Sequence, residues 1–339
     1  MSSRNNFNIE LIRFFAVLAV ILVHMSMGGF YSLLKSGNVV SWAVDSFYFS
    51  LTRFCVPVFF IISAHLVFTS KSEKKWYERV MKLIIPFVAW SIIYYLFNGG
   101  RDIAEMFKMM LTATTSFHLW FIPAFIGYSI LLPTIKAAFT EENKEKFKHV
   151  PILIFIFTIL TPTIAILLRQ LTGDDFSYIY GFQQFYLALP AYLTYAFCYP
   201  YLHKKIKPTK GMIIFSSLTI FNWILVSYLS ILNDSANEDL YGFTTAIVFI
   251  SSFYFFNSIM SMDFSFVNNK IRSFIMSVGK CSFGIYLCHW FVFDFLTRHG
   301  FYFTSKEVYS PIANTVLVFI FSYLLILTIK KIKYINKIA

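Results

Sequence analysis

Residues 9–28 read IELIRFFAVLAVILVHMSMG, an apolar stretch that carries Arg13 and His24. About 20 apolar residues in a helix are enough to cross the hydrocarbon core of a bilayer. Charged or titratable groups are costly at that depth, so each one is a candidate functional residue. A spacing of eleven residues returns Arg13 and His24 to nearly the same helix face, roughly 16 Å apart along the axis. This face suits a long anionic ligand whose reactive end reaches the histidine.

Similar apolar stretches dominate the rest of the chain. Of its 339 residues, 58% are hydrophobic, 14% are charged and 42 are phenylalanine, and the mean hydropathy is +0.64. A soluble domain has no interior large enough for so many long apolar runs, so we expect an all-α polytopic membrane protein that forms one domain over residues 1–339. Ten spans are predicted: 9–28, 45–68, 80–98, 118–136, 150–169, 184–202, 211–232, 242–260, 274–296 and 310–330.

The loop charges predict the orientation of these spans. Lysine and arginine gather in alternate loops, whereas the loops between them are poor in lysine or acidic, as at residues 233–239. Because cytoplasmic loops carry the excess of positive charge, both termini are expected in the cytoplasm. The basic clusters follow spans two, four, six, eight and ten: Lys71, Lys74, Lys75 and Arg79; Lys144, Lys146 and Lys148; Lys204, Lys205, Lys207 and Lys210; Lys270 and Arg272; Lys330, Lys331, Lys333 and Lys337.

This alternation also explains the formal net charge of +12. The positive residues follow topology and do not form one continuous basic surface, so we expect no nucleic-acid partner. The four cysteines lie within apolar segments and lack the spacing of metal ligands. We therefore expect neither a disulfide framework nor a bound metal.

Several polar residues are predicted to meet in the outer half of the membrane. Span one runs outward, which places Arg13 near the cytoplasmic leaflet and His24 near the outer one. Span two runs inward, with Asp45 at its outer end and Arg53 about two turns deeper, near the level of His24. His118 begins span four at the outer rim, and His289 lies near the middle of span nine.

These residue types fit acid–base chemistry on a hydroxyl group. A neutral imidazole at His24 can accept a proton from a hydroxyl nucleophile, a role worth roughly 10²–10⁴ in rate. Arg53 nearby would help to keep His24 neutral and can stabilise an oxyanion in a water-poor site. Asp45 would either orient an imidazole or pair with Arg53. On the cytoplasmic side, Arg13 and the basic cluster after span two can hold phosphates through charge-assisted hydrogen bonds.

Each of these residues also has a purely structural interpretation. Arg13 near a helix start can extend to lipid phosphate, and His24 can be a packing histidine. Arg53 can belong to a structural ion pair. His118 can be an interfacial residue and His289 a core residue.

Four segments of the chain resemble the membrane-integral acyltransferase 3 family. Arg13 and His24 match its Arg-x10-His motif, and residues 53–63, RFCVPVFFIIS, resemble its second-helix signature, with Ala64 where the family usually has glycine. Residues 117–121, FHLWF, and 282–289, SFGIYLCH, are similar to two further motifs of the family. The resemblance extends from residue 8 to about residue 295, over the ten helices that the family has.

The resemblance implies transfer of an acyl group, usually acetyl from cytoplasmic acetyl-CoA, to a sugar hydroxyl of an envelope glycan or its lipid-linked precursor in a bacterial inner membrane. The closest likeness is to O-acetyltransferases of enterobacterial common antigen, O-antigen and similar polysaccharides. The resemblance implies a catalytic role for His24 and donor-site roles for Arg13 and Arg53. From the residues we add Asp45 as a catalytic candidate and Lys71, Lys74, Lys75 and Arg79 for the donor. For the acceptor we add His118, Trp120 and His289, and sugar stacking on Trp120 and Tyr180.

Two other functions stay open from the sequence. A transporter or flippase for a lipid-linked sugar would line its path with the same polar groups, but no matched halves with broken helices are found. A membrane sensor would use the histidines as a pH switch. The sequence also leaves open whether the acyl group is acetyl or succinyl, and whether the chain forms a homodimer.

Overall fold

The expected all-α architecture is confirmed. The computed structural model describes residues 3–70, 76–112, 115–140, 142–173, 190–303, 308–333 and 335–339, and no strand occurs in these ranges. The longer helices are α1 (Ser3–Ser32), α2 (Val39–Leu51), α3 (Cys55–Thr69), α4 (Trp76–Phe97), α6 (Phe121–Ala138), α8 (Thr161–Thr172), α11 (Pro208–Leu232), α12 (Ala246–Ser261), α13 (Asn269–Arg298) and α14 (Ser310–Lys331). Shorter ones are α5 (Ile103–Leu111), α7 (His149–Phe155), α10 (Leu193–Leu202), and the single turns η1 (Phe117–Trp120), η2 (Ile156–Leu160), η4 (Asp239–Tyr241) and η5 (Ile335–Ile338).

Within the described residues, nine helical segments are long and apolar enough to cross a membrane. They correspond to nine of the ten expected spans, so the chain is a multi-pass membrane protein. Of the remaining expected span, 184–202, the structure describes α10 and the residues just before it, while residues 174–189, including Tyr180, lie outside the described part.

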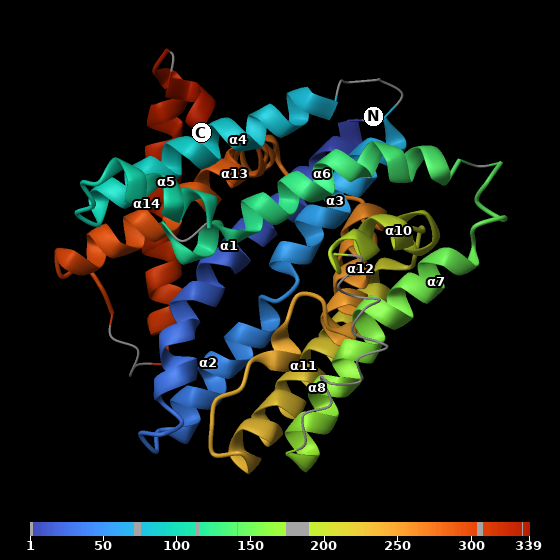
Figure 1. Ribbon diagram of the computed structural model, residues 1–339, viewed down its shortest axis with the longest axis horizontal. Helices are drawn as coiled ribbons and strands as arrows, with labels where there is room; N and C mark the ends of the chain where they lie inside the picture. The colour runs from blue at the N-terminus through green and yellow to red at the C-terminus, as the bar shows by residue number, and fades with distance from the viewer. Residues whose placement is uncertain are drawn as a thin grey trace.

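Both chain termini lie toward the top of the view in Figure 1. Chain ends on one side of a helix bundle fit an even number of crossings. The assignment of that side to the cytoplasm remains a prediction from the loop charges.

The second span is broken in the middle, which the sequence did not predict. α2 ends at Leu51, and α3 begins at Cys55 after a turn in which the Arg53 N–H donates to the carbonyl of Ser50. Pro57 has no N–H to offer to the carbonyl of Arg53, four residues earlier, so the helical hydrogen bond at this point is missing. The Thr52 hydroxyl adds hydrogen bonds to the carbonyls of Tyr48 and Phe49. Arg53 therefore projects from a turn and not from a continuous helix.

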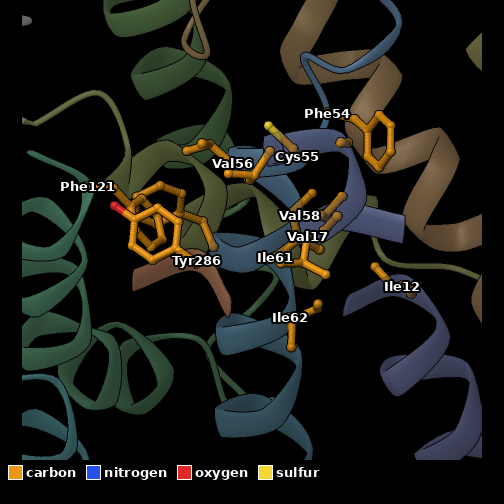
Figure 2. Close-up of a cluster of buried hydrophobic side chains, with 14 of the residues drawn as sticks. Ile12, Val17, Phe54, Cys55, Val56, Val58, Ile61, Ile62, Phe121 and Tyr286 are labelled. Atoms are coloured by element: carbon orange, nitrogen blue, oxygen red, sulfur yellow. The ribbon is translucent and has the colours of Figure 1, made fainter. Parts of the chain in front are cut away.

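α1 is the central helix and packs against α2, α3, α12, α13 and α14. It crosses the view in Figure 1 from the upper right to the lower left. Its fully buried Val17 lies among Val58 and Ile61 of α3 (Figure 2). Gly279 of α13 lets that helix approach α1 closely, since a Cβ there would lie 2.7 Å from the backbone oxygen of Glu10. The helices around α1 are therefore packed closely against it.

Candidate active site

Three histidines from distant parts of the chain meet beside α1. The ring of His24 stacks on that of His289 in α13, with centroids 5.2 Å apart and an interplanar angle of 21°. His118 in η1 lies 4.8 Å from His289 and 6.5 Å from His24, centroid to centroid. The sequence placed His24 and His118 at one depth, but it did not show that His289 is in direct contact with His24.

The three imidazoles differ in how their nitrogens are partnered. His118 Nδ1 is 2.9 Å from the hydroxyl of Ser116, and the hydroxyl of Tyr286 donates to the backbone carbonyl of His118. His289 Nδ1 must donate to the carbonyl of Tyr286, because a carbonyl only accepts, so in the neutral ring Nε2 carries the lone pair. His289 Nε2 and His24 Nδ1 are both buried without a hydrogen-bond partner among the described residues.

A cavity of about 410 Å³ opens beside this cluster and has the size of a small-molecule site. His24, partly exposed, and His118 line it, whereas His289 is fully buried behind His24. Arg53 and two carboxylates of the loop before α12, Glu238 and Asp239, complete its polar lining. Its other walls are mostly apolar or aromatic and include Trp120, which stacks on Phe243 with ring centroids 6.0 Å apart. The cavity thus combines a free imidazole, a guanidinium and aromatic faces.

Arg53 is held by aromatic rings and one carboxylate. Its guanidinium carbon lies 3.7 Å from the ring centroid of Phe49, and Nη2 is 3.2 Å from Glu238 Oε2. Its Nε is buried without a partner in the described part of the chain. The side chain of Glu238 is 47% exposed, so a ligand in the cavity can compete for this arginine. The sequence indicated Glu238 only as one member of an acidic outer loop.

Asp45 has neither of the two roles expected for it. It is buried in α2 and faces α1, where a Cβ on Gly29 would lie only 1.5 Å from Asp45 Oδ2. That oxygen is unpartnered within the described ranges, and Asp45 is not among the cavity-lining residues. The pairing with Arg53 was wrong, because the break between α2 and α3 turns Arg53 toward Glu238.

Arg13 is paired with a residue that was not predicted from the sequence. Glu10, one turn earlier in the stretch considered apolar, lies 2.8 Å from Arg13 Nη1. The carboxylate is 6% exposed and the arginine 27%. The i,i+3 spacing of opposite charges was the available signal. Of the basic cluster expected beside Arg13, Arg79 lies in α4, and Lys71, Lys74 and Lys75 lie outside the described residues.

The cavity does not reach Arg13. It extends along α1 from Met27 to Val20, and one turn further on Val17 is fully buried in the core. Val58 and Ile61 surround Val17 (Figure 2). The two ends of this helix face are therefore separated by an apolar layer, the Val17 layer, formed by these three residues.

The comparisons with known proteins give one match. The acyltransferase 3 family model, which describes an acyltransferase domain, matches residues 6–331. No curated protein and no solved structure matches the chain. The family match includes His24, Arg53, His118 and His289.

Proposed function

This chain belongs to the acyltransferase 3 family, and we propose that it is an O-acetyltransferase of a bacterial inner membrane. In this proposal, acetyl-CoA in the cytoplasm is the donor, and a sugar hydroxyl of an envelope glycan or its lipid-linked precursor is the acceptor. The observation that carries the proposal is the meeting of His24 and Arg53 on one cavity, with a buried nitrogen of His24 left unpartnered.

The chemistry follows from these two side chains. His24 accepts the proton of the sugar hydroxyl as its oxygen attacks the carbonyl carbon of the thioester. The Arg53 guanidinium stabilises the negative charge on the former carbonyl oxygen. The carbon–sulfur bond then breaks, and the thiolate leaves with the proton held by His24. The products are an acetyl ester and free coenzyme A.

His289 supports this role through its contact with His24. An unpartnered buried polar nitrogen costs about 1–3 kcal/mol, so one on each of two stacked rings is unfavourable for a packing cluster alone. The stacked ring of His289 restricts the orientation of the His24 ring. We therefore propose that His289 positions His24.

The acceptor enters from the side of the cavity where Glu238, Asp239 and Trp120 lie. Carboxylates accept hydrogen bonds from sugar hydroxyls, and an indole face packs on the apolar face of a sugar ring. His118 lines the same cavity and is held in place by Ser116. These residues support a carbohydrate acceptor.

The donor is proposed to approach from the opposite end of α1. Its phosphates would replace Glu10 as the partner of Arg13, with Lys71, Lys74, Lys75 and Arg79 adding positive charge. The pantetheine arm would cover the roughly 16 Å between Arg13 and His24. The Val17 layer lies between Arg13 and His24, so the side chains of Val17, Val58 and Ile61 have to move aside when the thioester reaches His24.

The test is transfer of radiolabelled acetyl from acetyl-CoA to candidate glycans by the purified protein. We expect His24→Ala to abolish transfer while donor binding is retained, and Arg13→Ala to weaken donor binding. His299→Ala is the matched control, because His299 is exposed and lines no part of the cavity. Unimpaired transfer by His24→Ala would rule out His24 as the base.

A further inference from the structure

A second and larger cavity shares no lining residue with the cavity at the three histidines. Its volume is about 730 Å³, and it lies between α7, α10, α11 and α12. Apolar and aromatic side chains form most of its wall, among them Phe155, Phe249 and Phe253. The proposed acyl transfer uses none of these residues.

The charged residues that line this cavity are lysines. Among the described residues, Lys148, Lys204, Lys207 and Lys210 line it, and no carboxylate does. All four are exposed, and the ion pair of Lys148 with Glu145, at 3.5 Å, is also exposed and therefore weak. α11 begins at Pro208, so the positive end of its helix dipole lies beside the lysines. The predicted cytoplasmic end of the cavity is thus a site for a negatively charged group.

The apolar part of the cavity is open toward the bilayer. Ile152 of α7 and Ile250 of α12 both line it, and they remain 55% and 37% exposed. Both belong to segments that can cross the membrane. Between α11 and α12 the wall is closed, because Gly211 lets the helices approach until a Cβ there would lie 2.1 Å from Ser258 Oγ. A ligand therefore enters this cavity laterally, from the hydrocarbon region.

We propose that this cavity binds an anionic phospholipid, with one acyl chain against the aromatic wall and the phosphate among the four lysines. Positive loops alone follow from topology, but here they surround an apolar cavity between helices, the arrangement that binds anionic headgroups. A soluble phosphate compound would use the lysines and leave the apolar part unused. The proposal does not depend on the acyl-transfer reaction.

The test compares two lipids that have the same acyl chains, dioleoylphosphatidylglycerol and dioleoylphosphatidylcholine. Native mass spectrometry of the full-length protein, released from detergent, counts the lipids that stay bound. We expect phosphatidylglycerol to be retained at least about fivefold better than phosphatidylcholine. Equal retention of the two lipids overturns the proposal.

Two variants separate the headgroup site from the chain site. The triple variant Lys204→Gln, Lys207→Gln, Lys210→Gln should weaken phosphatidylglycerol binding roughly tenfold or more. Its control, with the same loss of charge elsewhere, is Lys270→Gln, Lys331→Gln, Lys337→Gln, none of which lines the cavity. If the control loses as much lipid as the triple variant, the effect is one of total charge and the proposal is wrong.

Ile250→Trp narrows the opening without changing any charge, and Ile224→Trp on the exposed face of α11 is its control. We expect only Ile250→Trp to lose the lipid. Retention by Ile250→Trp would overturn the placement of the acyl chain.

Photocrosslinking of the wild-type protein tests where the acyl chain lies. Phosphatidylglycerol with a photoactivatable group in its acyl chain should crosslink to peptides 148–155 and 249–257. Crosslinks confined to other helices would contradict the proposed site.

Discussion

Removing the charge of Glu10 tests how Arg13 is held. Opposite unit charges 2.8 Å apart attract by about 6 kcal/mol at an effective dielectric constant of 20, and desolvation offsets much of this. Breaking a fully buried pair costs about 3–5 kcal/mol and an exposed pair about 0–1 kcal/mol. The side chain of Arg13 is 27% exposed, and glutamine can still accept a hydrogen bond from it. We therefore expect Glu10→Gln to lower the free energy of unfolding by about 2 kcal/mol.

The assay is equilibrium unfolding of the purified protein by sodium dodecyl sulfate in mixed micelles. Asp294→Asn is the control, because Asp294 pairs with Arg298 at 2.7 Å while their side chains are 31% and 49% exposed. This control should cost less than about 1 kcal/mol. If Glu10→Gln costs no more than the control, Arg13 reaches lipid phosphate instead, and the pair does not hold it.

Three further substitutions test the packing and the site. Gly279→Ala should destabilise the protein by about 1–3 kcal/mol, because its Cβ would lie 2.4 Å from Glu10 Oε2, whereas Gly28→Ala, with no atom within 4 Å, should be neutral or stabilising in the same unfolding assay. Gly279→Ala as stable as Gly28→Ala would contradict the close packing of α13 on α1. His289→Phe keeps an aromatic ring at this position and removes both nitrogens. We expect the rate of acetyl transfer to fall about a hundredfold, with little change in the free energy of unfolding. An unchanged rate would make His289 a packing residue. Pro57→Ala restores the missing N–H, so the helix can continue through residues 52–54. The rate of acetyl transfer should then fall about tenfold or more, while the free energy of unfolding is kept. Full activity would show that the reaction does not need the break between α2 and α3.

The sequence predicted the spans well because apolar length is a property of each segment alone. α1, α11 and α14 all contain the stretch expected for them, with a few added residues at their ends. The depth of the polar residues in the membrane could also be predicted, since it depends on the rise per residue and on the orientation of each helix. His24 and Arg53 do line one cavity.

What the sequence could not predict is the direction in which each side chain points, because helix rotation depends on packing between helices. His289 was placed near mid-membrane, but its stacking on His24 depends on how α13 packs against α1. The pairing of Arg53 with Glu238 needs the turn before Pro57 and a loop from a distant part of the chain. Depth alone cannot distinguish Glu238 from Asp45 as the partner of this arginine.

The apolar layer between Arg13 and His24 bears on how a two-substrate reaction can occur inside a membrane. The cavity at His24 is lined by Glu238 and Asp239, while Arg13, beyond the Val17 layer, is paired with Glu10. In the proposed reaction, the first is the acceptor side and the second is the donor side. An open passage between them would let water reach the thioester and would let ions cross the bilayer. Val17, Val58 and Ile61, all fully buried, lie across the path of such a passage. In the proposed reaction, donor binding therefore has to supply the energy that opens the layer, and we propose that this energy comes from the replacement of Glu10 by phosphate as the partner of Arg13.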